Sequence, residues 1–263
     1  MTFEYKASYN MEDLVSIMRL LREPGGCPWD AEQTHESIKK NLIEETYEVI
    51  EAINKKDSVL LCEELGDLLM QVVFHAQMEA ELGSFNIGNV TDGVCKKLIE
   101  RHPHVFGDIK VRSSDEVLTN WDSIKRKSKG QKSSGEAMQS VPRELPALMR
   151  ATKIQKKAAS CGFDWQEIDG ALDKLREEID ELSAAISKQD SANAFEELGD
   201  VLFSAVNVSR FLRCDAEEAL TAANDKFMSR FISVEQLAKE KGVELNMLSL
   251  EELDKLWDTA KAL

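Results

Sequence analysis

Apolar side chains recur every three or four positions along most of the chain, which is the spacing of one face of an α-helix. Strict alternation of apolar and polar residues, the pattern of a half-buried strand, is rare. Only five prolines and 13 glycines interrupt the helical pattern. We therefore predict an all-α fold. The clearest helical faces are Leu14, Ile17, Met18 and Leu21 in the first half, and Leu172, Leu175, Ile179 and Leu182 in the second.

Two stretches depart from this amphipathic pattern in the same way. CEELGDLLMQVV at 62–73 and FEELGDVLFSAV at 195–206 each place acidic residues ahead of an almost continuous apolar run. The apolar run predicts a buried helix, and a carboxylate at its head costs several kcal/mol if it is left unpaired. Both stretches therefore need a cation near the acids.

These stretches belong to a longer internal repeat. GGCPWD, EETYE, EELGD, KLIER and WDSIK in the first half recur, in the same order, as CGFDW, EEIDE, EELGD, KFMSR and WDTAK. Sixteen residues separate Glu48 from Glu64, and sixteen separate Glu181 from Glu197. The repeat indicates tandem duplication of one helical domain. Because 125–140 is polar and poor in apolar residues, we predict domains at 1–128 and 143–263 with a linker at 129–142.

Composition narrows the class of protein. The 263 residues carry a formal net charge of −15, which repels nucleic acid in bulk. No apolar run reaches the roughly 18 residues of a membrane span, and the N-terminus has no apolar segment of a secretory signal. The five cysteines form no CxxC pair. We therefore expect a cytoplasmic protein that binds neither membranes nor nucleic acid.

Paired carboxylates are the strongest chemical signal. Residues three apart share a helical face, so Glu178 with Glu181, and Glu197 with Asp200, each form an acidic stripe. A turn predicted at 189–192 makes the two helices antiparallel neighbours, so that the four acids converge. Such oxygen ligands suit Mg²⁺, with Mn²⁺ as a possible substitute. The corresponding first-half ligands are Glu45, Glu48, Glu64 and Asp67. For any single acidic motif, the alternative to a metal site is a solvated helix face.

Basic and aromatic residues downstream complete the pattern of a polyphosphate site. Lysine and arginine four apart on one face can grip phosphate oxygens, and a tryptophan beside a lysine can stack a base. Packing in the apolar core is the alternative role for these tryptophans, and the sequence leaves it open. The predicted nucleotide-contacting residues are Lys226, Arg230, Trp257 and Lys261 in the second half, and Lys97, Arg101, Trp121 and Lys125 in the first.

Other motifs receive structural interpretations. We interpret His102 and His104 as part of a helix end rather than a metal pair, and His35 and His75 as lone histidines. Trp29 is expected to seal the bundle, with Asp30 as a helix N-cap. A role for Trp29 in a nucleotide pocket is the alternative. Gly66 and Gly199, between the paired acids, are expected to keep bulk away from the ligands. No Walker A, GxGxxG or GxSxG pattern is present.

Taken together, GCPWD, EETYE, EELGD, RHPHVF, LPALMRA, GFDW and the second EELGD resemble the MazG family of nucleoside triphosphate pyrophosphohydrolases, in its two-domain bacterial form. The resemblance runs from about Met11 to the end. It implies helical bundles that pack across a homodimer and Mg²⁺-dependent hydrolysis of NTPs and dNTPs to monophosphate and pyrophosphate.

Residue roles follow from the same resemblance. It implies that the paired acids hold the metal and that the downstream basic and tryptophan residues contact the nucleotide, with Lys174 as a weaker candidate. Our hypothesis assigns catalysis to Glu177, Glu178 and Glu197, with a water oriented by the metal or by one of the first two. A non-catalytic nucleotide sensor or partner-binding protein is the alternative. The physiological substrate, the number of metals, the phosphorus attacked and the activity of the first half stay open.

Overall fold

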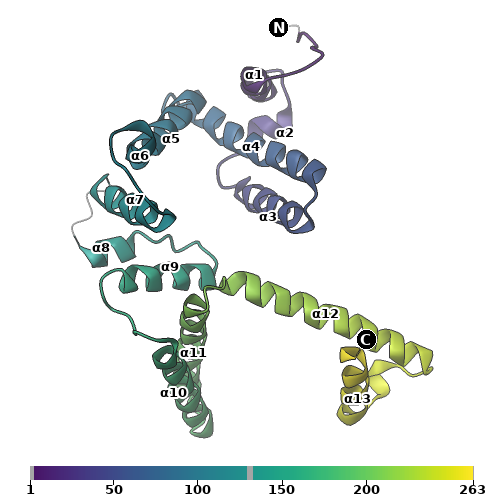
Figure 1. Cartoon of the computed structure of the whole chain (residues 1–263). Coiled ribbons are helices and arrows are strands. Elements are labelled where there is room, and N and C mark those ends of the chain that lie inside the picture. Colours follow the sequence, from purple (N-terminus) through teal and green to yellow (C-terminus); the bar gives the residue numbers. More distant parts are fainter. Residues whose placement is uncertain (1–2, 129–132, 263) are drawn as a thin grey trace. The chain divides into compact units, whose positions relative to one another are not determined.

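The computed structural model describes residues 3–128 and 133–262, and within these ranges the chain forms helices joined by turns and loops, without a strand (Figure 1). The all-α prediction is confirmed. No helix in the described part is long and apolar enough to cross a membrane.

The chain divides into two compact units, Met1–Lys125 and Arg126–Leu263. The division falls within the last helix of the first unit, close to the predicted domain end at residue 128. Part of the predicted linker, 129–132, lies outside the described residues, and the rest contains a short helix. The exact domain boundaries stay a prediction.

The helices of the two units follow one another along the chain in a similar order. The first unit contains α1 (Met11–Arg22), α2 (Pro28–Glu32), α3 (Lys39–Lys55), α4 (Ser58–Glu81), α5 (Ile87–Arg101), α6 (Pro103–Phe106) and most of α7 (Ser114–Ser128). The second contains α8 (Ser134–Gln139), α9 (Ala147–Ala159), α10 (Ile168–Ser187), α11 (Ser191–Phe211), α12 (Ala216–Glu240), the 3-10 helix η1 (Leu245–Met247) and α13 (Leu250–Lys261).

Each unit is built around one helical hairpin, α3–α4 or α10–α11, and both hairpins turn in the same way. Lys56 and Gln189 adopt left-handed backbone angles, with φ of 56° and 55°. The next residue caps the following helix: Asp57 accepts from the amides of α4, and Asp190 accepts from the amide of Asn193. These caps fix where the second helix begins. The second turn lies at 188–190, overlapping the predicted 189–192.

The first unit has an apolar core between α1 and α4. Met18, Val73, Phe74 and Met78 are buried in it together with Ile38, which precedes α3. The predicted face of α1 thus packs as expected at Met18. The second unit has its own apolar cluster where α13 packs on the last turns of α12, formed by Val234, Ala238, Leu256 and Ala260.

The predicted apolar face of α10 is not its most buried face. Ala171, Glu178 and Ala185, spaced seven apart, are buried, whereas Ile179 is 46% exposed. The seven-residue spacing places these three side chains on one seam of α10, which packs chiefly on α11. Small alanines permit close approach of the two helices, and one glutamate is enclosed between them.

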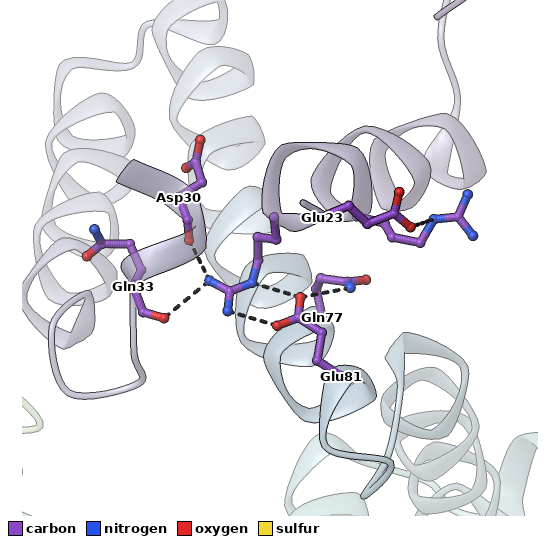
Figure 2. Close-up of polar contacts among 7 residues, drawn as sticks. Glu23, Asp30, Gln33, Gln77 and Glu81 are labelled. Carbon is purple, nitrogen blue, oxygen red and sulfur yellow. Dashed lines mark hydrogen bonds and ion pairs between the residues drawn. The ribbon is translucent and has the colours of Figure 1, made fainter. Parts of the chain in front are cut away.

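Arg22, at the end of α1, fixes the loop that leads to the first hairpin. Its guanidinium makes two bonds to Glu81 of α4, both 2.9 Å, and also donates to the backbone oxygens of Asp30 and Gln33 (Figure 2). Only 7% of its side chain is exposed. A bidentate pair of this kind is directional, so α1, α2 and α4 are held together at one point.

In the second unit an arginine also pins the loop that leads to the hairpin, but here the arginine belongs to the hairpin and the acid to the loop. Arg210 of α11 binds the carboxylate of Asp164, in the loop before α10, and the side chain of Asn207. In the first unit the hairpin supplies the acid, whereas in the second it supplies the base. Both loops before the hairpins are therefore pinned by ion pairs.

The GGCPWD loop differs from the prediction in two details. Trp29 is 59% exposed and does not seal a core. Asp30 lies inside α2, whose N-cap is Cys27 without a side-chain cap bond. The reason is that Pro28 begins the helix one residue before the tryptophan, which places Trp29 on the outer side of a short helix.

Replacement of Arg22 by methionine should lower the free energy of unfolding by about 1–3 kcal/mol, because the backbone oxygens of Asp30 and Gln33 lose their charged donor. Arg19→Met is the matched control on the same helix. Arg19 pairs with Glu23 four residues on and is half exposed, so its loss should cost under about 0.5 kcal/mol. Urea unfolding of the full chain, followed by circular dichroism, measures both. Equal losses would contradict the proposed role of Arg22.

Candidate functional site

The second hairpin brings three predicted ligands together. Glu178 of α10 and Glu197 and Asp200 of α11 each offer an oxygen, and these oxygens lie within 4.8 Å of one another. Their convergence follows from the antiparallel pairing of the two helices, since each helix contributes acids from the face that meets the other. The predicted carboxylate cluster of the second half is therefore present in the geometry.

Glu178 is the most enclosed member, with 5% of the residue exposed. The ammonium of Lys174, one turn earlier on α10, lies 2.8 Å from Glu178 and 2.8 Å from Glu177. The hydrogen bond to Glu177, followed by that to Glu178, raises the pKa of Lys174. Lys174 thus stays charged and supplies a positive charge at the edge of the cluster.

Glu181, the fourth predicted ligand, joins the cluster through Glu178. Its pKa is raised chiefly by a side-chain hydrogen bond with Glu178, then by burial and by the negative charge of Glu197. Glu181 therefore lies close to Glu178 and interacts with the converging carboxylates of Glu178 and Glu197.

The first hairpin repeats this arrangement with Glu45, Glu48 and Glu64, whose oxygens also lie within 4.8 Å of one another. Burial, followed by the charge of Asp67, raises the pKa of Glu45. Burial, followed by the charge of Glu48, raises the pKa of Glu64. All four predicted first-half ligands therefore interact, although Asp67 stands outside the group of three.

The two clusters differ in one cation. The position three residues before the EExxE motif is Lys174 in the second half and Asn41 in the first. Within the described ranges, no ion pair joins a lysine or arginine to the first-half cluster. The first cluster therefore carries a larger uncompensated negative charge.

Both clusters have the chemistry of a divalent-metal site. They offer only carboxylate oxygens, which are hard ligands, from two facing helices at ligand spacing. In each cluster, a divalent cation bound between the carboxylates would also relieve the repulsion that raises the pKa values of these groups. These acidic residues are thus able to hold a metal ion. Added Cβ atoms at Gly66 and Gly199 would meet no atom of the chain within 4 Å, and the expectation that these glycines keep bulk away from the ligands stays a prediction.

The basic and aromatic residues of the second half gather elsewhere, on α12 and α13. Trp257 of α13 packs against Phe227 of α12, with ring centroids 5.0 Å apart. Phe227 directly follows Lys226 and lies three residues before Arg230. Lys261 pairs with Asp258. Among the described residues no hydrogen bond or ion pair connects Lys226 or Arg230 with the carboxylate cluster.

The length of α12 explains this separation. Its first residue, Ala216, is buried at the end of α12 that follows α11, and the amide of Met149 on α9 donates to Glu217. Arg230 lies fourteen residues farther along, which is about 21 Å at 1.5 Å per residue. Figure 1 shows α12 running away from the α10–α11 hairpin.

The first half gathers its own basic and aromatic residues at the end of α5. The guanidinium of Arg101 lies 5.5 Å from the ring centre of Trp121, and His102 packs edge-on at 4.9 Å. The Nε of Arg101 is buried without a hydrogen-bond partner in the described chain. Lys97 is exposed one turn earlier, and Lys125 follows Trp121 by one turn. His102 thus has the structural role at a helix end that we predicted, and it also holds Trp121.

Sequence reasoning missed one polar cluster. His35 and His75, interpreted as lone histidines, face each other with their Nδ1 atoms 2.7 Å apart, and Nε2 of His35 lies 2.9 Å from Glu79. The loop after α2 folds over α4 and brings them together. The only available signal was the spacing of His75 and Glu79, which are one helical turn apart, and that spacing says nothing of His35.

Comparison with known proteins agrees with this geometry. The model of the MazG nucleotide pyrophosphohydrolase domain matches twice, at residues 33–106 and 166–234. Each match includes one hairpin and its carboxylate cluster. The two matches therefore correspond to the internal repeat.

Similar proteins cover almost the whole chain. The nucleoside triphosphate pyrophosphohydrolase of Escherichia coli K12 is 46% identical over 95% of this chain and 97% of its own length. The nucleoside triphosphate pyrophosphohydrolase/pyrophosphatase MazG of Thermotoga maritima is 47% identical over 97% of both. The uncharacterized protein YabN of Bacillus subtilis is 49% identical over 94% of this chain and 50% of its own length. The chain therefore belongs to the MazG family.

Proposed function

We propose that this chain is a Mg²⁺-dependent nucleoside triphosphate pyrophosphohydrolase that converts NTPs and dNTPs to monophosphate and pyrophosphate. The observation that carries the proposal is the convergence of carboxylate oxygens on each hairpin at ligand spacing. Two relatives that align over nearly the full chain are named for this activity. We place the enzyme in the cytoplasm, because all five cysteines are free.

In the second unit, Glu178, Glu181, Glu197 and Asp200 would hold Mg²⁺ or Mn²⁺, and the first-unit cluster would hold a second ion. When bound, the metal supplies positive charge against the triphosphate oxygens. Lys174 holds the carboxylates of Glu177 and Glu178 in place at 2.8 Å. Either carboxylate can accept a hydrogen bond from the attacking water and take its proton as the new oxygen–phosphorus bond forms and the bond to pyrophosphate breaks.

Lys226 and Arg230 would bind phosphate oxygens, Trp257 would stack on the base and Lys261 would approach the phosphates. Lys97, Arg101, Trp121 and Lys125 would contact a nucleotide in the first half, whereas we propose that most turnover takes place at the second-half cluster, where Lys174 holds the carboxylates. In the second half these groups lie on α12 and α13, whereas the carboxylates lie on α10 and α11. Because α12 carries its basic residues away from the α10–α11 hairpin, we infer that a substrate contacts the two sets from different copies of the chain.

We therefore propose a homodimer in which each copy supplies α12 and α13 to the carboxylate hairpin of the other. Exposed apolar side chains on α12 support this arrangement. Phe227, Met228 and Ile232 are each between 56% and 59% exposed. A monomer seldom leaves such an apolar stripe in water, and a two-fold interface buries the same stripe of both copies.

Replacement of Glu197 by glutamine should reduce pyrophosphate release by on the order of 100-fold or more, since even outer-shell changes at metal sites cost about 10–100-fold. The matched control is Glu64→Gln, the same position in the first cluster. Because that cluster lacks a counterpart of Lys174, the control should keep at least about half of the activity. Products from a mixture of dNTPs and Mg²⁺ are identified by chromatography. Orthophosphate without monophosphate, or undiminished turnover of Glu197→Gln, would refute the proposal.

Addition of Mg²⁺ at about ten times its Kd should stabilise the protein by about 1.4 kcal/mol for each occupied cluster, or about 2.8 kcal/mol for both, which corresponds to a rise of about 5 °C in Tm. The physical reason is relief of carboxylate repulsion. NaCl of equal ionic strength is the control for screening. The double variant Glu64→Gln/Glu197→Gln removes one ligand from each cluster and should lose most of the Mg²⁺ effect. An equal shift in the variant would exclude these residues as ligands.

Mixing two inactive proteins tests the shared site. Glu197→Gln lacks a carboxylate and Arg230→Ala lacks a phosphate contact, so each homodimer should be inactive. If sites are shared, refolding an equal mixture yields half mixed dimers with one intact site each, and about one quarter of the normal activity returns. Absence of recovery, with mixed dimers demonstrated by sedimentation, would locate the site within one chain. A monomer at micromolar concentration would contradict the homodimer.

A further inference from the structure

A pocket of about 360 Å³ lies between α9 and α11 in the second unit. Its volume is within the range of small-ligand sites. Most of its wall is apolar. The apolar lining residues are Leu145, Leu148, Ile154, Leu202, Phe203 and Val206.

This pocket is distinct from the carboxylate cluster. Gly199, Leu202, Phe203 and Val206 line it from α11, at spacings of three and four that define one helical face. The acids Glu197 and Asp200 belong to a different face, which meets α10. The wall is open at Gly199, because a Cβ added there would meet nothing within 4 Å.

The pocket is positively charged within a strongly negative protein. Arg143 and Arg150 are the two ionisable residues that line it, and no carboxylate is among the lining residues, although the chain as a whole carries −15. Neither arginine forms an ion pair within the described part of the chain. Glu217, the acid that reaches this end of α9, accepts a hydrogen bond from the amide of Met149.

Arg150 of α9 lines the pocket and is partly buried. Its Nε atom is shielded from solvent and has no hydrogen-bond partner in the described structure. A buried N–H without an acceptor costs the full desolvation of that group, and more when the group is charged. Because Nε is shielded, it does not face the pocket, and an anion there would bind the terminal nitrogens of the guanidinium, a group that binds phosphate oxygens well.

We propose that this pocket is a metal-independent binding site for a nucleoside monophosphate. The base and sugar would occupy the apolar recess, and the phosphate would bind Arg150 and Arg143. Two arginines match the charge of one phosphate group. A triphosphate would need a metal, for which the pocket offers no carboxylate ligand. That the ligand is the product of the enzyme's own reaction rests on the proposed function, whereas the site itself does not.

Equilibrium dialysis of AMP against the full chain in excess EDTA tests the site. Wild type should bind AMP, and Arg150→Gln should bind at least tenfold more weakly because a charge-assisted bond is lost. Arg143→Gln should also weaken binding. Lys153→Gln is the matched control, since it removes an exposed positive charge from the same helix outside the pocket. Glu197→Gln and Lys153→Gln should bind AMP as wild type does.

Ala151→Phe provides a second variant, because it fills the pocket without a change of charge and should also abolish AMP binding. Circular dichroism confirms that each variant is folded. Three outcomes would overturn the inference: AMP binding that requires Mg²⁺ or is lost in Glu197→Gln, undiminished binding by folded Ala151→Phe, or equal affinity for AMP and inorganic phosphate. Metal-independent AMP binding by a protein that releases no pyrophosphate would refute the proposed function alone.

Discussion

Repulsion between converging carboxylates is the constraint around which each unit is organised. Two unit charges 4 Å apart repel by about 4 kcal/mol at an effective dielectric constant of 20, and each hairpin places three acids within 4.8 Å. In the second unit Glu178 lies on the alanine seam of α10, between Ala171 and Ala185. The small neighbours let the helices approach closely enough for the acids to meet, so the packing that forms the hairpin also creates its need for a cation.

The rest of each unit holds this strained pair of helices in register. A left-handed residue followed by an aspartate cap sets the turn, and an arginine pins the loop that leads into the first hairpin helix. The two copies reach the same end by different residues. Arg22 binds an acid of the hairpin, whereas Arg210 belongs to the hairpin and binds an acid of the loop. The two units therefore share this geometry but use different partners, and Lys174 lies beside the cluster in the second half alone.

Pattern reasoning was accurate where function depends on neighbours along one helix or across a short turn. The spacing of Glu178 and Glu181, and of Glu197 and Asp200, was enough to predict their convergence, because helix period and turn length fix it. It was wrong for Trp29 and Asp30, because Pro28 begins α2 one residue before the tryptophan, and for His35, whose position depends on where a loop lies against α4. Loop packing is set by contacts distant in sequence, such as those of Arg22, and no local period encodes them.

The sequence by itself determined the helical fold, the duplication and the two carboxylate clusters, since each follows from a period of three to four residues or from a repeated spacing. Only the tertiary structure decided that Glu181 lies close to Glu178, that Lys174 compensates Glu178, and that the cations of α12 lie away from the hairpin. The physical reason is that a helix period fixes a direction around its own axis, whereas the path of α12 and the apolar space beside Arg150 depend on how whole helices pack.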